Sequence, residues 1–522
     1  MAIKGSIGRD QKVCNCFMPL LFGGALSWHN TSKERILSLG GGVVSAFSEY
    51  LNNCINKYLA GSELSKNDLI STCKVNRSTF FQCMRGMRVP TQELFQTLLE
   101  ILQLSPGEEA KLRQLYYIAQ IGEPVYQSRQ WARKCLETLA VLSAEGVSQI
   151  HQFAVATHIT AARAAIYGED QIFQELCQLA QAEIFLDNPQ IDLFLPRYDA
   201  PFFEYLKVLY RGCSDKSVRL RQLIQFPQKK EEKAKASLEF LHFALFFLAS
   251  SNNYYEAYYY YSDAEAADVI GVLYPYSVIT STSVLLINET MDQGLFSTTP
   301  EILEACRRQF EETMRKSRTF VNTLSRYEQI VPLLCESCDK GEQRYQFCAT
   351  PCFDSYLTDK MLKKYFCGRK KELMGCFSSN LKWKNSECCF CSRKGILDFA
   401  QTGIVPNYPA ELILPLDTKD RREVLQKMLQ HLLKKGGIYL VDENKLTVSE
   451  EFIFTLYEDE RILAYRKGIS QQRVYQLQEQ NLLSAFADYF QTLAKSQLVR
   501  PKAELEQVLR EAIQSCSCEN ME

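Results

Sequence analysis

The sequence predicts an α+β protein, in which an all-helical N-terminal domain precedes a large α/β region with signs of internal duplication. Two observations lead to this expectation. Short helical patterns with clear start signals fill residues 46–121, whereas strand-like and helical stretches alternate after Asp187. A chain of 522 residues also exceeds what one hydrophobic core can organise, so several domains are expected.

The start signals define the helical domain. Ser65 and Asp68 resemble a capping box, and Asn76 and Thr91 can cap the two helices that follow. In "SPGEEAKLRQLYYIAQIG", Ser105 precedes a proline at the first helical position, and Gly122 ends the pattern. We therefore place a compact helical domain at residues 43–122.

The remaining segments are assigned by changes in composition and in helical or strand-like periodicity. We expect residues 1–42 to be a poorly ordered leader or to precede a true start near Val43 or Val44. Lys4, Arg9 and Lys12 before an apolar stretch also fit a signal peptide. The other expected segments are a helical connector (123–186), a first α/β half (187–333), a cysteine-rich and helical insert (334–437), and a second α/β half with C-terminal helices (438–522).

Similar helix endings suggest the duplication. The helix "TPEILEACRRQFEETMRKS" closes the first series of strands, and "NLLSAFADYFQTLAKS" closes the second. Each helix follows a pair of strand-like stretches, so we interpret the two series as degenerate copies of one unit.

Composition limits the function classes. The formal net charge is −1, from 60 basic and 61 acidic residues, so any nucleic-acid binding must come from a local patch. The 20 cysteines are scattered through helical patterns, where they are typical of small buried residues in a reducing compartment. No segment reaches the roughly 18 apolar residues that a membrane span needs. We expect a cytoplasmic protein with no membrane partner.

Residues 63–91 carry the functional prediction. Leu64, Leu69, Ile70, Val75, Phe80 and Cys83 are spaced to bury one side of two crossed helices, joined by the short link "CKV". This arrangement leaves a polar set facing outward on the second helix, of side-chain types that reach base edges and phosphates in DNA. Lys66 begins the first helix, where it would meet a phosphate. The candidate DNA-binding residues are Lys66, Asn76, Arg77, Ser78, Thr79, Gln82, Arg85 and Arg88.

This stretch resembles the helix-turn-helix of the lambda-repressor-like, or Xre-type, transcriptional regulators. The resemblance covers about 75 residues and extends to "LFQTLLEILQLSPGEEAKL". It implies that residues 76–85 form the recognition helix. Phe81 and Met84 depart from the family pattern, because polar residues are more usual at their positions. The matching residues are Leu69, Val75, Asn76, Arg77, Ser78, Thr79, Arg85, Gly86, Arg88 and Pro90.

The rest of the chain resembles the large C-terminal regions of some Xre-type regulators. More remotely, its paired strands and long helix are similar to the phospholipase-D-like effector domains of certain sugar-sensing regulators. Active phospholipase-D enzymes need a His-x-Lys pair in each half, and none of the five histidines here begins one. We therefore expect a non-catalytic sensor region, and no enzyme, catalytic residue or cofactor.

The cysteines leave two alternatives open. Cys335 and Cys338, with Cys348 and Cys352, have spacings that could hold zinc, although chance clustering explains them as well. A thiol-based redox sensor is the other alternative. An effector enzyme with a helical docking module is a further hypothesis. The main prediction is a sequence-specific transcriptional regulator that binds double-stranded DNA as a homodimer and responds to a small-molecule or peptide effector.

Overall fold

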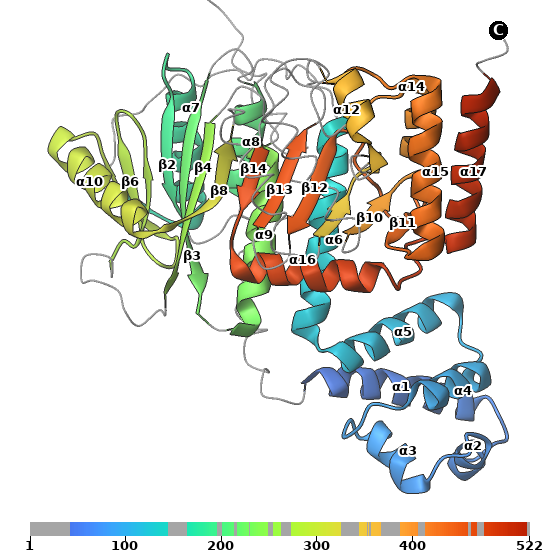
Figure 1. Ribbon diagram of the computed structural model, residues 1–522. Helices are drawn as coiled ribbons and strands as arrows, with labels where there is room; N and C mark the ends of the chain where they lie inside the picture. The colour runs from blue at the N-terminus through green and yellow to red at the C-terminus, as the bar shows by residue number, and fades with distance from the viewer. Residues whose placement is uncertain are drawn as a thin grey trace, which may run out of the picture. The chain divides into compact units, whose positions relative to one another are not determined.

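Figure 1 shows the computed structural model of the chain. It describes residues 42–144, 164–195, 201–212, 217–228, 230–248, 254–262, 273–324, 344–351, 353, 356–366, 387–405, 413–457, 461–466 and 474–518. The predicted fold class is confirmed, because an N-terminal helical region precedes a mixed sheet with helices. The chain divides into two compact units, one ending at Tyr126 and the other beginning at Gln127. The leader predicted at residues 1–42 lies almost wholly outside the described residues.

The first unit is all-helical. Its helices are α1 (Gly42–Ala60), α2 (Lys66–Thr72), α3 (Arg77–Met84), α4 (Gln92–Leu102) and α5 (Pro106–Ile121), and α6 (Glu123–Ala144) begins in it. The predicted caps at Ser65, Asn76, Thr91 and Ser105 are confirmed, each accepting a hydrogen bond from a backbone N–H in the first turn. At the centre of the core, Phe95 stacks on Tyr116 with ring centroids 3.7 Å apart. Local capping signals thus define these helices, and aromatic packing assembles them.

The second unit is built on one sheet. In the described residues it has 14 strands in the order β1-β7-β6-β5-β2-β3-β4-β8-β14-β13-β12-β9-β10-β11. The first seven strands are β1 (Ala165–Tyr167), β2 (Gln190–Phe194), β3 (Arg219–Pro227), β4 (Tyr254–Ser262), β5 (Tyr276–Ile279), β6 (Val284–Ile287) and β7 (Gln293–Ser297). The other seven are β8 (Arg318–Leu324), β9 (Arg344–Phe347), β10 (Glu387–Cys391), β11 (Ile438–Leu440), β12 (Phe452–Tyr457), β13 (Arg461–Arg466) and β14 (Val474–Leu477).

The strand order shows an internal repeat. The first seven strands lie in the order 1-7-6-5-2-3-4, and adding seven to each number gives the order of the second seven. The pairing directions repeat as well: β2-β3-β4 and β9-β10-β11 are parallel, and every other pair within each set is antiparallel. We call these sets the first and second repeats.

The second repeat is turned over relative to the first. The repeats are joined by β4 and β8, which are antiparallel. When strand directions are followed from neighbour to neighbour across the first repeat, β1 is parallel to β4. β8 is the counterpart of β1, so it runs in the opposite direction to β1. Equal lateral order with reversed strand direction requires a half-turn about an axis lying in the sheet across its width. Equivalent helices of the two repeats therefore cover opposite faces of the sheet.

Helices bury both faces of the sheet, as Figure 1 shows. In the first repeat α7 (Glu169–Ile184), α8 (Pro201–Gly212) and α9 (Lys230–Leu248) lie on one face, where Phe240 meets Phe226 of β3, and α10 (Pro300–Lys316) covers the other face. In the second repeat α16 (Gln480–Leu493) is the counterpart of α10, and Phe490 stacks on Tyr345 and Phe390. The opposite face is covered by α12 (Asp359–Tyr365), α14 (Arg393–Thr402), α15 (Thr418–Lys434) and α17 (Lys502–Cys518).

The structure divides this unit differently from the sequence analysis. The predicted connector at 123–186 contains β1 and α7, which belong to the first repeat. The predicted insert at 334–437 supplies β9 and β10 together with α12, α14 and α15, so it forms the first part of the second repeat. These strands are short, and the cysteines of "ECCFC" carry little strand signal in a sequence, because cysteine packs equally well in helices.

A buried carboxylate joins the repeats. Glu479 is the N-cap of α16 and is fully buried; it accepts hydrogen bonds from the backbone N–H of Leu482 at 2.7 Å and of Asn481 at 3.1 Å. It also accepts a hydrogen bond from the hydroxyl of Tyr261 on β4, in the first repeat. Burial and the neighbouring carboxylate raise the pKa of Tyr261, so its phenol stays protonated and donates.

Replacing this cap is expected to destabilise the second unit. Glu479→Ala leaves several donors without an acceptor, and we expect it to reduce the free energy of unfolding by about 2–3 kcal/mol. Glu479→Gln keeps the shape and one acceptor oxygen, so its loss is expected to be about half as large. Urea denaturation followed by circular dichroism measures both. Equal stability of the Ala variant and the unmodified protein would contradict this role.

Candidate nucleic-acid interface

α2 and α3 are joined by a turn with a fixed backbone conformation. Lys74 in this turn has φ of 50°, the left-handed conformation that short links between helices use. The side chain of Asn76 then accepts a hydrogen bond from the N–H of Ser78 at 2.9 Å and starts α3. Asn76 therefore has a structural role at the position that the sequence analysis assigned to DNA contact.

The other end of α3 is closed by a glycine. Gly86 has φ of 69°; its N–H donates to the carbonyl of Cys83 at 3.1 Å, and the N–H of Met87 donates to that of Gln82 at 2.9 Å. This pair of bonds is the Schellman ending, in which glycine avoids the steric cost of a Cβ atom. The chain then leaves α3 through Arg88 and Pro90. The hydroxyl of Tyr116 donates a hydrogen bond to the carbonyl of Pro90, which fixes the direction of this exit.

Side chains of α1 also hold the end of α3. The hydroxyl of Ser48 donates to the carbonyl of Cys83 at 2.9 Å, and the amide of Asn52 donates to the carbonyl of Met84 at 2.7 Å. Terminal carbonyls of a helix have no partner within the helix, so these bonds satisfy them and fix the angle between α1 and α3. The sequence analysis did not identify Ser48 or Asn52, because neither lies near α3 in the sequence.

The structure separates the predicted inner and outer faces. Leu69, Ile70, Phe80 and Cys83 are buried, and Val75 is half-buried. The prediction was wrong for Leu64, which is 44% exposed because it precedes the cap of α2 and lies outside the helix. Of the candidate DNA-binding residues, Lys66 and Thr79 are half-buried, and Asn76, Arg77, Ser78, Gln82, Arg85 and Arg88 are exposed.

The two positions that depart from the family pattern differ in environment. Met84 is buried in the core, so its apolar character is structural. Phe81 is half-buried: it packs edge-on against Phe80 at 6.0 Å, and the guanidinium carbon of Arg77 lies 5.8 Å from its ring centroid. One aromatic residue is thus placed on the partly exposed side of α3, next to an exposed arginine.

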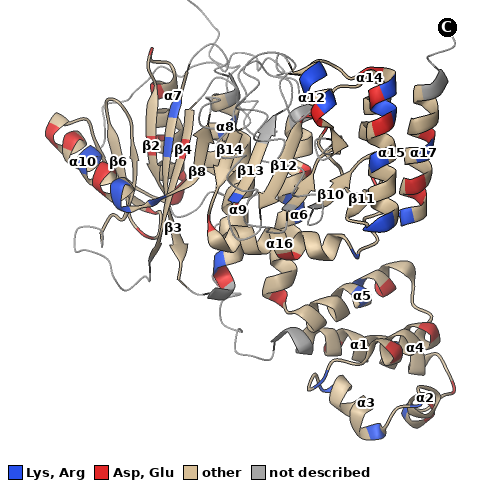
Figure 2. Ribbon diagram, viewed as in Figure 1, with Lys and Arg blue, Asp and Glu red and all other residues tan. Residues whose placement is uncertain are grey.

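Charge in the first unit is unevenly distributed, as Figure 2 shows. Residues 66–88 contain five basic residues and one acidic residue, whereas residues 89–126 contain two basic and five acidic ones. Lys57 pairs with Glu108 at 2.6 Å and Arg113 with Glu109 at 2.7 Å. Within the described part of the chain, the basic side chains of residues 66–88 form no ion pair, so the surface of α2 and α3 carries uncompensated positive charge.

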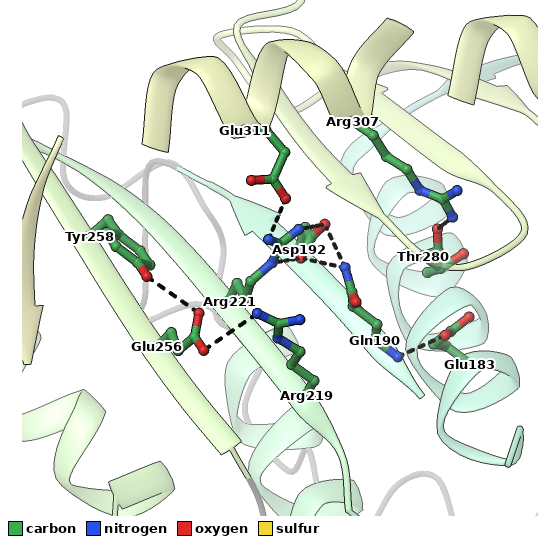
Figure 3. A network of polar contacts seen from close by, with 10 residues as sticks. All are labelled: Glu183, Gln190, Asp192, Arg219, Arg221, Glu256, Tyr258, Thr280, Arg307 and Glu311. Carbon is green, nitrogen blue, oxygen red and sulfur yellow. Dashed lines mark hydrogen bonds and ion pairs between the residues drawn. The ribbon is translucent and has the colours of Figure 1, made fainter. Parts of the chain in front are cut away.

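The second unit contains a buried ion cluster, shown in Figure 3. Arg221 on β3 is 6% exposed and binds Asp192 on β2 through two hydrogen bonds of 2.7 Å; the Asp192 side chain is 1% exposed. Arg221 also donates to Glu311 of α10. Burial lowers the pKa of Arg221, but the hydrogen bonds to Asp192 and Glu311 outweigh burial and raise it overall. The guanidinium is thus fully charged and is neutralised by protein groups.

A second set of polar contacts continues this cluster. Buried Glu183 accepts hydrogen bonds from the N–H of Gln190 at 2.8 Å and from the hydroxyl of Ser281 at 2.6 Å. Arg307 of α10 donates to the carbonyl of Thr280 at 2.7 Å. The clusters around Arg221 and Arg307 together attach α10 to the sheet. In the second repeat the helix in the same place, α16, packs instead on the aromatic rings of β9 and β10.

The cysteines that the structure describes behave as core residues. Eleven of them are free thiols, and eight of these eleven are buried. In the first unit burial raises the pKa of Cys54, Cys73 and Cys83, which reduces the thiolate fraction that redox chemistry needs. The described residues include no cluster of His, Cys, Asp and Glu able to hold a metal ion. Cys335, Cys338 and Cys352 lie outside the described residues.

Comparisons with known proteins give remote likenesses only. The chain matches no model of a protein family, and no curated protein is similar to it. The solved structure of TrmBL2, an archaeal chromatin protein, matches 44% of this chain and 84% of that protein, at 10% identity and a TM-score of 0.20. The match to the solved structure of the polyphosphate kinase from Porphyromonas gingivalis covers 80% of this chain and 65% of that enzyme, at 11% identity and a TM-score of 0.21.

One expectation is corrected by these comparisons. The sequence analysis predicted that the chain is not an enzyme, and this prediction does not stand: an enzyme is among its remote likenesses, which at a TM-score of 0.21 assign no activity to this chain. The absence of a His-x-Lys pair removes one covalent mechanism and excludes no other chemistry. Among the described helices, none is both long and apolar enough to cross a membrane.

The buried cluster leads to a stability prediction. Asp192→Ala leaves the Arg221 charge poorly compensated in the core, and we expect a loss of about 3–5 kcal/mol in the free energy of unfolding. The double variant Asp192→Leu with Arg221→Met removes both charges and is expected to recover most of that loss. Urea denaturation of Asp192→Leu, of Arg221→Met and of the double variant completes a double-mutant cycle. Glu506→Ala, which breaks an exposed pair with Arg510, is the control, with an expected loss below about 1 kcal/mol.

Proposed function

We propose that this chain is a sequence-specific DNA-binding transcriptional regulator of the Xre, or lambda-repressor-like, type. One observation carries the proposal: α3 presents exposed Arg77, Ser78 and Gln82 while its opposite side is buried. An α-helix fits the major groove of DNA, and these side-chain types match the donors and acceptors on base edges there. Arg77 and Gln82 are assigned to base contacts with guanine and adenine.

Uncompensated basic residues around α3 support the proposal. Arg85 and Arg88 flank the Schellman ending, and Lys66 begins α2, so positive charge lies at both ends of the helix pair. Contacts to phosphates fix the register of a protein on DNA and supply most of its salt-dependent affinity. We assign Lys66, Arg85 and Arg88 to the phosphate backbone, and Ser78 and Thr79 to the edge of the groove. Asn76 acts in the interface as the cap of α3.

The second unit is proposed to dimerise, to bind an effector, or both. A single eight-residue recognition helix contacts few base pairs, and two-fold dimers gain specificity by binding half-sites about 34 Å apart. The proposed dimer thus follows from what recognition requires. A regulator acts where the genome is, so we propose a cytoplasmic location. Small molecules and peptides are the proposed classes of effector.

Removing the base-contacting side chains is expected to abolish selectivity. In selection from a random DNA library at stated salt, the unmodified protein should enrich one sequence, and Arg77→Ala with Gln82→Ala should enrich none. The matched control is Arg113→Ala with Gln114→Ala on α5, two exposed residues on a helix outside the proposed interface. Should the Arg77 and Gln82 variant select the same sequence as the unmodified protein, the assignment of α3 is wrong.

Phosphate contacts are expected to appear in the salt dependence. Replacing Arg88 by Ala should weaken binding to all DNA sequences alike and reduce the slope of log K against log salt concentration by about 0.9. Fluorescence anisotropy at several salt concentrations measures the slope. Arg113→Ala, which removes an arginine paired with Glu109, should leave it unchanged. An unchanged slope for Arg88→Ala would remove Arg88 from the interface.

A further inference from the structure

We propose that Phe81 and Arg77 act as one reading unit for a guanine with an adjoining thymine in the DNA site. The inference rests on the proposed DNA-binding function and names the base step that α3 would recognise. Phe81 is an aromatic residue at a position where the resembling family has polar side chains.

Phe81 is held in place from below. It lies on the turn of α3 that follows Arg77, and its ring contacts the ring of Phe80 at 6.0 Å with an interplanar angle of 89°. Phe80 is fully buried, so it provides a fixed support. Phe81 itself is half-buried, and its position four residues after Arg77 places it on the same face of α3 as that arginine.

Arg77 is oriented by this ring. Its guanidinium carbon lies 5.8 Å from the ring centroid of Phe81, within the range of cation–π attraction. Arg77 forms no ion pair with any residue that the structure describes, so its contact with the Phe81 ring is what orients the guanidinium. A planar guanidinium that is already ordered loses less entropy when it binds the O6 and N7 atoms of guanine.

The exposed part of Phe81 then faces the neighbouring base. The C5-methyl group of thymine is the apolar feature of the major groove, and phenylalanine is one of the side chains that contact it. Residues four apart in a helix are separated by about 6 Å along its axis, and the arginine bends towards the ring. Adjacent base pairs are about 3.4 Å apart, so a guanine bound by Arg77 places the next base beside Phe81.

The test uses uracil, which is thymine without the methyl group. The unmodified full-length protein first selects its preferred sequence from a random library, and each thymine of that sequence is then replaced by uracil in turn. We expect one guanine with an adjoining thymine in each half-site. Uracil at that thymine should weaken binding about three- to fivefold, from the loss of one buried methyl contact. Uracil at thymines away from this step is the matched control and should leave affinity unchanged.

Two substitutions at Phe81 separate its contributions. Phe81→Leu keeps an apolar surface for the methyl group but removes the ring, so it should keep the thymine effect and select guanine less strongly. Phe81→Gln should lose the difference between thymine and uracil. Arg77→Lys keeps the charge without the planar fork and should reduce selection of guanine about tenfold. Circular dichroism and the thermal midpoint of each variant show whether it folds.

The outcomes are distinct. A selected sequence without a guanine–thymine step, or equal affinity for thymine and uracil at that step, overturns the inference and leaves DNA recognition by α3 intact. Failure of the unmodified protein to select any sequence overturns the proposed function and this inference with it. The uracil result requires no variant, so a poorly folded Phe81 substitution does not affect it.

Discussion

The surface of the first unit depends on how α3 is attached. A helix of eight residues is too short to be stable alone, because the cost of nucleation is shared by few hydrogen bonds. Here the Asn76 cap, the Gly86 ending and the hydrogen bonds from Ser48 and Asn52 satisfy its terminal groups. Phe80, Cys83 and Met84 bury its inner side. Because the caps at both ends and the buried inner side stabilise α3, its outer positions can carry polar and charged residues.

Acidic and basic residues are paired locally in both units of the chain. A net charge of −1 conceals a basic segment at 66–88, because acidic residues are concentrated on other helices and pair with the few basic residues there. In the second unit, Arg221 is neutralised by Asp192 and Glu311 under α10, whereas α16 covers its equivalent face with rings. The two repeats thus share a strand order and differ in the chemistry of this face.

Much of the fold could be read from the sequence where the signals are local. Caps such as Ser65 and Ser105 act within one helical turn, and the long periodic helices α10 and α16 carry their own pattern. β1 has three residues and β10 reads "ECCFC", so neither has enough alternation to reveal a strand. The attachment of α3 to Asn52 spans 32 residues of sequence, and an asparagine on a helix gives no sign of its partner. The outward set on α3 was predicted because burial follows helical periodicity; the ion cluster was not, because it depends on strand register.

The half-turn between the repeats has a consequence for association. The last parallel strand of the first repeat, β4, pairs with β8, the first strand of the second repeat. The last parallel strand of the second repeat could pair in the same way with the first strand of a further copy. At the corresponding place beside β11, Val441 pairs with Val499, and the N–H of Arg500 donates to the carbonyl of Leu440. This short segment leads into α17, which packs against α14 and α15. An exposed sheet edge is a template for uncontrolled growth into fibres, and this segment blocks the edge that the repeat geometry would otherwise leave open.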